Sequence, residues 1–510
     1  MTATEVRSPV LASVASVSPI RLVTLVLLFS AAPLLETTRL TALSSVDVWW
    51  HLRTGLWILQ QHAFPRTGLF SQYSNLPWHA SNWLYDLSLA ALFKIWGLRA
   101  IVILLMVLKL ALAWATYRLA RAAGARFWLA VALSAASQYV IPALQPVSSS
   151  LSIVFLGLQL LVLVESRRSG SVRPLFWFPA LFLAWANLDL QVVLGLTLLL
   201  LFALALACEE GVRRAGVACL RNGGAPLRLK KVGAIAGLSL LCTLANPYTF
   251  HIFVDVVRSL YNPASFQYVA EMRAMSFRRP QDYLLMLLVM TAFLALGRRR
   301  SLEVFEPMAL VAGTLLAFRI QRDAWVAVLP AIAVIGAEFS RERRGESLGS
   351  DGRWRWRKSL TAIAVAAVFF GAVLRLPPDK SLLQRIGRNF PVQACDFIGT
   401  NHLSQPIFNA YSWGGFLTWY LPDYPVSVDS RADLYGDEIL ERYFEVVGGT
   451  TRPEADPAFA SAQMLLLERQ SGMVKALTEI PVLRARYRMV YNDDLAAVFV
   501  RQSVSSGQER

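Results

Sequence analysis

The chain has 510 residues, of which 55% are hydrophobic and 16% are charged, and its mean hydropathy is +0.45. Because a typical soluble protein carries about 25% charged residues, this composition argues against a water-soluble fold. The formal charge of +16 would suit a nucleic-acid-binding protein, but Arg and Lys gather in short loops between apolar segments. The positive-inside rule gives that pattern in membrane proteins, so we expect no nucleic-acid partner.

The apolar segments predict eleven membrane spans, because each is long enough to cross, or nearly cross, a hydrocarbon layer about 30 Å thick. In chain order they are 20–35, 98–117, 127–142, 151–164, 175–187, 190–208, 232–246, 283–296, 304–318, 324–337 and 360–373. The first stretch follows Arg7 and Arg21 and could instead be a cleaved signal peptide. A signal peptide would leave the next loop on the same outer side, so the predicted topology holds either way.

The segment 83–96 is a twelfth candidate, and its placement decides the sidedness of everything after it. If it lies in the membrane interface without crossing, all the basic clusters between the later spans fall on the cytoplasmic side. These clusters are Arg118/Arg121/Arg126, Arg167/Arg168/Arg173, 213–231, Arg298/Arg299/Arg300 and 341–358. We therefore predict a cytoplasmic N-terminus, an outer C-terminus and an outer juxtamembrane helix at 83–96.

The outer segments are 36–97, 247–282 and everything after about residue 375. In the last segment the pattern changes to short β-like runs at 406–408, 425–428 and 496–500, interleaved with helical stretches such as 459–469. The sequence thus predicts an all-α polytopic membrane bundle at 1–376, with an outer loop at 36–97, and a small soluble extracytoplasmic α/β domain at 377–510.

The first outer loop holds Asp47 and His51, four residues apart. On a helix their side chains share a face and could bind a cation together or hydrogen-bond one another. The structural reading is that Asp47 caps the helix ahead of Val48 and that His51 anchors it. The predicted sidedness favours a functional role, because it brings other polar residues to the same membrane face.

These residues lie in the turns between later spans and outline a polar outer mouth in an apolar bundle. They are Gln145, Ser148, Ser149, Ser150, Asn187, Asp189, Asn246, Arg319, Gln321, Arg322 and Asp323. Singly, each could merely reach the interface from a helix end. Jointly they suit an amphiphilic substrate whose lipid tail stays among the membrane lipids while its head reaches the surface.

Sugar transfer from a lipid phosphate matches this set of groups. Arg319 and Arg322 could hold a phosphate by charge-assisted hydrogen bonds, and Asp47 could take a proton from an acceptor hydroxyl. The phosphate leaves with growing negative charge, so a cation, either Arg or a divalent metal, lowers the barrier.

The stretch DVWWHLRTGLWIL, with the following PRTGLFS and WHASNWLYD, resembles the first outer loop of bacterial polytopic proteins of the GT-C glycosyltransferase superfamily, in the lipopolysaccharide-core and mannosyltransferase-like group. The segment FNAYSWGGFLTWYLPDYPVSVDSRADLYGD is similar to the periplasmic tail of that group. The resemblance implies a polyprenyl-phosphate-linked sugar donor, an active site at the outer face of the bacterial inner membrane and a catalytic acidic residue, which maps to Asp47. It leaves His51, Asn187, Asp189, Asn246, Arg319 and Arg322 as candidate substrate-binding residues.

Two departures from the group's pattern bear on metal binding. Relatives often carry a D-x-D pair in the first loop, whereas this chain has Ser45 before Asp47, and Asp189 stands where a His is expected after WANL. Three readings stay open. A divalent ion such as Mg²⁺ or Mn²⁺ is bound by Asp47, His51 and Asp189, or no metal is needed, or activity has been lost.

Asp429, Arg431 and Asp433 alternate along a short run, so on an extended segment they share one face. They either form a structural ion-pair cluster or bind the acceptor near the membrane surface. For the whole chain, the alternative to a transferase is a non-catalytic glycan or lipid translocator, or an envelope assembly factor, which predicts polar groups running deep through the bundle. A hydrolase is disfavoured, because neither G-x-S-x-G nor H-E-x-x-H occurs.

Overall fold

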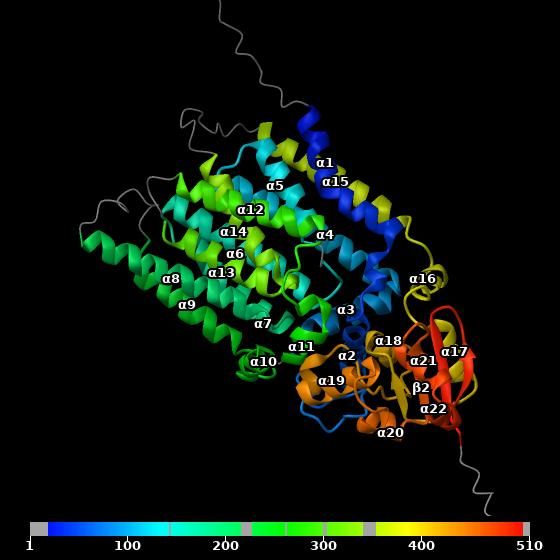
Figure 1. The fold of residues 1–510 in the computed structure, drawn as a ribbon. Helices are drawn as coiled ribbons and strands as arrows, with labels where there is room; N and C mark the ends of the chain where they lie inside the picture. The colour runs from blue at the N-terminus through cyan, green and yellow to red at the C-terminus, as the bar shows by residue number, and fades with distance from the viewer. Residues whose placement is uncertain are drawn as a thin grey trace, which may run out of the picture.

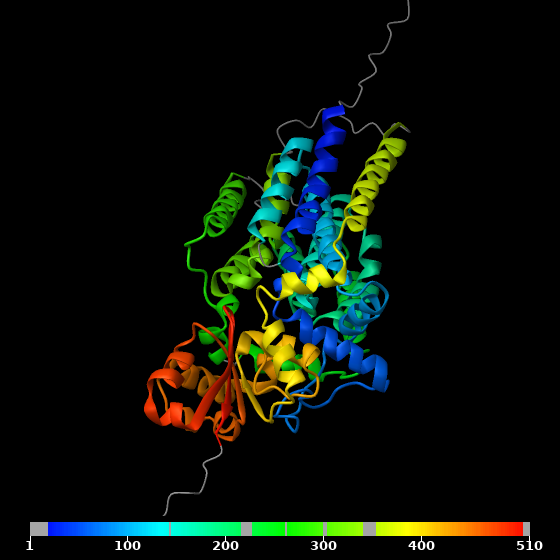
Figure 2. The same cartoon turned by 90° about the vertical axis from the view of Figure 1, so that its right-hand side faces the viewer.

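The computed structural model describes residues 19–141, 144–215, 227–260, 263–298, 303–339 and 353–502. A bundle of helices extends from a small α/β domain formed by the C-terminal part of the chain (Figure 1). Turned by 90°, the first outer loop still lies beside that domain, at one end of the bundle (Figure 2). Parts of the predicted basic clusters, at 216–226, 299–300 and 341–352, lie outside the described residues.

Each of the eleven predicted apolar stretches is a helix. They are α1 (Pro19–Arg39), α4 (Arg99–Ala123), α5 (Phe127–Val140), α6 (Ser148–Ser169), α7 (Phe178–Leu188), α8 (Val192–Arg214), α9 (Leu229–Thr243), α12 (Pro280–Gly297), α13 (Phe305–Arg319), α14 (Trp325–Glu338) and α15 (Arg353–Leu374). The remaining short elements of this part are η1 (Thr41–Ser44), η2 (Arg173–Trp177), α10 (His251–Leu260), α11 (Pro263–Tyr268), η4 (Ala270–Met272), η5 (Gln321–Asp323) and α16 (Asp379–Ile386).

Five of these helices, α1, α4, α6, α8 and α12, are long and apolar enough to cross a membrane, and α15 with α16, bent by 80°, would make a sixth. The shorter apolar helices have 11 to 15 residues. At about 1.5 Å per residue they span only roughly 16–22 Å, so the total of eleven spans stays a prediction. Helix α14 is apolar all round and buried along almost its whole length, as expected of a helix at the centre of a bundle.

The predicted juxtamembrane helix is α3 (Trp83–Trp96), which packs on α2 (Val48–Gln61). Gly55 permits this contact, because a Cβ atom there would lie 1.9 Å from the carbonyl oxygen of Asp86. The close approach fixes α3 against the helix that follows Asp47.

The C-terminal domain holds a four-stranded sheet in the order β1-β2-β4-β3. Strands β1 (Ile407–Asn409) and β2 (Met464–Glu468) are parallel, whereas β4 (Ala496–Arg501) is antiparallel to β2 and to β3 (Tyr487–Asn492). The helices around it are α17 (Val392–Thr400), α18 (Tyr411–Tyr420), α19 (Ala432–Gly448), η6 (Pro453–Ala455), α20 (Pro457–Ser461), α21 (Gly472–Glu479) and α22 (Pro481–Arg486). The predicted α/β character is confirmed.

The helix predicted at 459–469 is wrong. Its first residues end α20, and its second half is β2, all of whose residues except Glu468 are buried. A short continuous apolar run such as MLLL fits a buried strand as well as a buried helix, so periodicity alone misassigned it. The run at 425–428 forms no regular strand, but Val426 makes an isolated bridge with Ser71 of the first outer loop.

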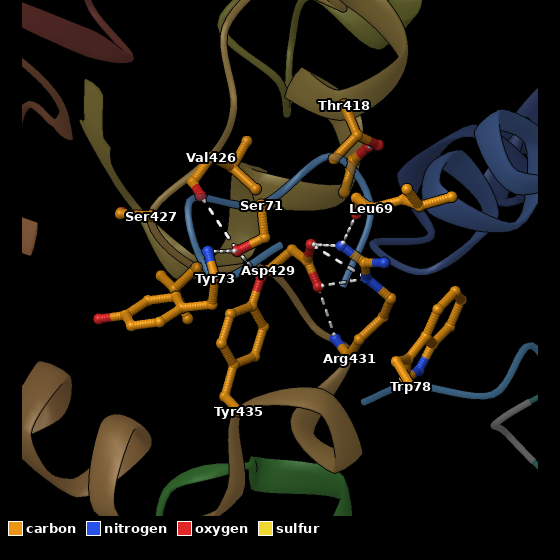
Figure 3. Close-up of polar contacts among 12 residues, drawn as sticks. Leu69, Ser71, Tyr73, Trp78, Thr418, Val426, Ser427, Asp429, Arg431 and Tyr435 are labelled. Carbon is orange, nitrogen blue, oxygen red and sulfur yellow. Dashed lines mark hydrogen bonds and ion pairs between the residues drawn. The ribbon is translucent and has the colours of Figure 1, made fainter. Parts of the chain in front are cut away.

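An ion pair buried inside the C-terminal domain fastens the first outer loop to it (Figure 3). Arg431 Nη2 lies 2.7 Å from Asp429 Oδ2, and neither side chain is exposed. The same Nη2 donates to the carbonyl oxygen of Leu69, and the guanidinium lies 4.7 Å from the ring centroid of Trp78. Trp78 in turn donates from Nε1 to Asp433 Oδ2 at 3.0 Å. The contacts therefore support a structural role for Asp429, Arg431 and Asp433. They do not support acceptor binding by these residues.

Two consecutive glycines let helix α18 pack closely on two segments, the one that carries Asp429 and the one that carries Asp47. A Cβ atom at Gly414 would lie 2.1 Å from the carbonyl oxygen of Val428, and one at Gly415 would lie 2.8 Å from that of Val46. Next to this contact, Trp49 stacks on Trp419 with ring centroids 4.9 Å apart. The C-terminal domain thus fixes the backbone on both sides of Asp47.

Arg431→Ala is expected to lower the free energy of unfolding by about 3–5 kcal/mol, because it leaves the Asp429 carboxylate buried without its partner. The double change Asp429→Leu/Arg431→Met removes both charges and should cost less. Denaturant titration of the purified protein in detergent compares the two variants with wild type. A single variant as stable as the double one would contradict this account of the interface.

Candidate functional site

Polar residues from four separate segments meet at the end of the bundle next to the C-terminal domain. Ser45 Oγ donates to Gln145 Oε1 at 2.8 Å, and Gln145 Nε2 donates to Glu271 Oε1 at 3.1 Å. Asp47 and Arg322 lie near enough for their charges to act on Glu271. We call these five residues the Asp47 cluster. The prediction that turns distant in sequence share one end of the bundle is confirmed.

The Asp47 carboxylate has no structural function that the contacts reveal. Asp47 immediately precedes α2, but its side chain makes no cap hydrogen bond there. Within the described ranges it also forms no ion pair. The expectation that Asp47 serves as a helix cap is therefore wrong, and a partly exposed carboxylate is left available for chemistry.

His51 does not pair with Asp47. Its Nδ1 lies 2.5 Å from Asp86 Oδ1 of α3, and the two side chains are only 3% and 0% exposed. Trp50 stacks on the imidazole with ring centroids 3.6 Å apart. Burial raises the pKa of Asp86, and the neighbouring His51 partly offsets that shift. His51 thus has a structural role, because its partner is Asp86 of α3 and not Asp47.

Asp189 is buried in the turn between α7 and α8, where neighbouring groups satisfy its carboxylate. Ser152 Oγ donates to Oδ2 at 2.9 Å, Ser148 Oγ to Oδ1 at 3.4 Å, and the backbone N–H of Gln191 to Oδ2 at 3.4 Å. Burial raises the pKa of Asp189 to about 6. The hydrogen bonds and the positive charge of Arg322 act in the opposite direction and lower the pKa. Asp189 therefore holds this turn and does not present an open carboxylate to a substrate.

The two predicted asparagines also hold turns. Asn187 accepts from Trp83 Nε1 at 3.0 Å and donates to the carbonyl oxygen of Ala245 at 3.0 Å. Asn246 Oδ1 accepts from the backbone N–H of Tyr248 at 2.8 Å, which closes its own turn. Both amides are engaged with protein groups, so the contacts do not support their predicted role in substrate binding.

Two predicted arginines keep charge available at this end of the bundle. Arg322 is 35% exposed, and its Nε lies 3.6 Å from Asp323 Oδ1, too far for a hydrogen bond. That Nε is buried and has no hydrogen-bond partner among the described residues. Arg319 is exposed at the end of α13, with its guanidinium 5.4 Å from the ring centroid of Phe266.

Glu271 was missed by the sequence prediction. The loss of surrounding water and the negative charge of Asp47 raise the pKa of its carboxyl group. Three acidic residues occupy the segment 247–282, and the other two have structural partners. Asp255 pairs with His79 at 3.0 Å, and Asp282 completes the cap at the start of α12. Only the cap at Asp282 could be read from the sequence, so no pattern singled out Glu271.

The predicted metal ligands Asp47, His51 and Asp189 are not brought together. Over the ranges that the structure describes, no group of three or more His, Cys, Asp or Glu side chains could hold a metal ion. His51 and Asp189 are instead occupied by the partners described above. The predicted ligand set is thus not the one this fold assembles.

Comparison with known proteins finds similar chains among solved structures only. No protein-family model matches the chain, and no curated protein matches it. Among solved structures the chain is similar to ArnT from Cupriavidus metallidurans bound to undecaprenyl phosphate, at 14% identity and a TM-score of 0.48, over 95% of this chain and 99% of that one. The apo state of that protein aligns at 13% identity and a TM-score of 0.45, over 93% and 97% of the two chains.

The raised pKa of Asp189 predicts a pH dependence of stability. An acid whose folded-state pKa lies above its unfolded value contributes stability that is full below the unfolded pKa of about 4 and is lost as pH rises through about 6. A difference of about two pKa units corresponds to roughly 3 kcal/mol. Asp189→Asn should remove this loss, whereas Asp423→Asn, an exposed control, should keep it. Thermal unfolding across that pH range tests this, and equal pH slopes for Asp189→Asn and wild type would contradict it.

Proposed function

We propose that the protein is a membrane glycosyltransferase, which moves a hexose or pentose from a polyprenyl-phosphate-linked donor to an acceptor at the outer face of a bacterial inner membrane. The observation that carries the proposal is the carboxylate of Asp47, which makes no cap hydrogen bond, near the carboxyl group of Glu271 and near Arg322, whose Nε has no hydrogen-bond partner among the described residues. Charged groups gathered at a bundle end are costly unless they serve a purpose, so this gathering favours a functional role.

The chemistry of transfer uses these groups directly. The bond between the anomeric carbon and the phosphate oxygen breaks, and a new bond forms from that carbon to the acceptor oxygen. Asp47 accepts the proton of the acceptor hydroxyl. Arg322, with Arg319 beside it in sequence, stabilises the negative charge that develops on the leaving phosphate.

An outer location is supported by the opposite end of the bundle. There Arg167 forms an ion pair with Glu209 at 2.9 Å and another with Glu303 at 3.3 Å. Arg118, Arg121, Arg213 and Arg214 lie at the same helix ends, as the positive-inside rule expects of a cytoplasmic side. The Asp47 cluster then faces outward, where a lipid-linked sugar can present its head while its tail stays in the bilayer.

The buried polar groups inside the bundle give no support to a translocator. Thr116 and Ser134 hydrogen-bond each other at 2.9 Å, and Gln159 donates to the carbonyl oxygen of Gly195 at 2.9 Å. Each pair is local and joins neighbouring helices. A translocation path needs polar groups that continue through the bundle.

Asp47→Asn should lower sugar transfer by about 10²–10⁴-fold, because the amide cannot accept a proton. The measurement is the polyprenyl phosphate released from its sugar-linked form in membrane vesicles that hold the native acceptor. Asp494→Asn, which changes an exposed aspartate of the C-terminal domain, is the charge-matched control and should keep the wild-type rate. Wild-type transfer by Asp47→Asn would refute the assigned base.

Arg319→Ala/Arg322→Ala should weaken binding of a polyprenyl-phosphate sugar by about 10–100-fold, since each charge-assisted hydrogen bond is worth roughly 1.5–3 kcal/mol. Native mass spectrometry of the purified protein measures that binding. Arg484→Ala, on the exposed face of α22, removes one positive charge far from the cluster and should bind normally. If folded wild-type protein does not bind the donor at all, a translocator or assembly factor becomes the better account.

A further inference from the structure

We propose that Glu271 is a second catalytic carboxyl group, held by Gln145 and Ser45 near Asp47 and Arg322, and that it passes a proton to the leaving phosphate. The inference rests on the proposed transferase function and assigns the route of the proton within it.

The hydrogen-bond relay fixes the orientation of Glu271. An amide has one accepting and one donating end, so the hydroxyl of Ser45, by donating to Gln145 Oε1 at 2.8 Å, turns the amide nitrogen toward Glu271. That nitrogen then donates to Glu271 Oε1 at 3.1 Å. Glu271 Oε2 accepts no hydrogen bond from the described residues and is left for a ligand. Ser45 thus orients the Gln145 amide in this chain, at a position where relatives of the resembled group often carry an acidic residue.

The backbone around Glu271 is also anchored to the segment that carries Arg322. Gln321 Nε2 donates to the carbonyl oxygen of Ala270 at 2.5 Å, and the backbone N–H of Gln321 donates to the carbonyl oxygen of Arg273 at 3.0 Å. These contacts hold η4 against η5. The backbone segments that carry Glu271 and Arg322 are therefore held together.

Two groups of opposite charge act on Glu271. Asp47 repels the ionised carboxylate, and Arg322 attracts it. Two further cations on the same loops, Arg273 and Arg319, are directed to a backbone carbonyl and to an aromatic ring. Although the Glu271 side chain is exposed at the surface, the partial loss of water around its carboxyl group and the charge of Asp47 raise its pKa, so it takes up a proton more readily than a free glutamate.

Asp47 and Glu271 together account for every proton in the reaction. Asp47 takes the proton of the acceptor hydroxyl as the acceptor oxygen bonds to the anomeric carbon. Protonated Glu271 gives its proton to the phosphate oxygen as the bond from that oxygen to the anomeric carbon breaks. Transfer of the proton from Asp47 to Glu271 restores both carboxyl groups, and no oxidant, reductant or further reactant is consumed.

The test uses undecaprenyl phosphate as the probe and native mass spectrometry of the full-length protein from acidic to alkaline buffer. Glutamine imitates a protonated glutamate but cannot lose a proton. Glu271→Gln and wild type should therefore bind equally in acid, and wild type should bind about tenfold more weakly in alkaline buffer. Glu271→Asp should keep the wild-type pH dependence, and so should Glu479→Gln, an exposed control.

A second variant tests whether Gln145 positions the carboxyl group of Glu271 or has only a structural role. The hydrogen bond from Gln145 lowers the pKa of Glu271, so Gln145→Leu should move the fall in affinity to higher pH. The proposal is overturned if wild type and Glu271→Gln share one pH dependence, or if Gln145→Leu leaves the wild-type fall where it was. Failure of wild type to bind undecaprenyl phosphate at any pH would instead overturn the proposed function itself.

Discussion

The position of Asp47 depends on the close packing of helix α18 against the backbone of the first outer loop. Gly415 allows the helix to approach the carbonyl oxygen of Val46, where a Cβ atom would lie 2.8 Å away. Trp49, completely buried, fills the space between Phe416, Phe390 and Trp419. Because other groups hold the backbone on both sides, the carboxylate of Asp47 needs no structural bond of its own. The C-terminal domain is therefore part of the proposed site even though Asp47 lies far from it in sequence.

Exposure to solvent separates the structural charged residues from the candidate catalytic ones. A buried charge must be paired and hydrogen-bonded. Asp429 with Arg431, and Asp86 with His51, are buried ion pairs within the protein, although Arg431 Nη1 and Asp86 Oδ2 have no hydrogen-bond partner among the described residues. The charged members of the Asp47 cluster are instead partly or fully exposed. Arg322 has a buried donor without a partner, and Glu271 engages only one of its oxygens, so this is where an external phosphate or hydroxyl would complete the bonding.

Much of the architecture could be predicted from the sequence, because helix formation in apolar segments is a local property. Every apolar stretch became a helix, and Trp83–Trp96 became a separate helix on α2. The same local reasoning misassigned β2, whose apolar run carries no decisive period. It also left open how many of the shorter helices cross the membrane.

The site was harder to predict, because pairings between distant segments decide it. The spacing of Asp47 and His51 indicated a shared helical face, but Asp86, 35 residues after His51, displaced that pairing. We expected Asp189 to bind a metal, but its carboxylate accepts hydrogen bonds from serine side chains. Glu271 had no local signal at all, since its importance comes from Gln145, 126 residues earlier in the chain. Asp47 and Arg322 were identified because acidic and basic groups at outer helix ends suit phosphate chemistry, whatever their partners.

The central claim is that the phosphate of a polyprenyl carrier binds at the Asp47 cluster. A cryo-electron microscopy structure of the full-length protein with undecaprenyl phosphate in a lipid nanodisc tests it most directly. We expect the phosphate to contact the guanidinium of Arg322 and the free oxygen of Glu271, with Asp47 facing the position of the departing sugar. A phosphate bound at the opposite end of the bundle, or one that contacts neither Arg322 nor Glu271, would contradict the account.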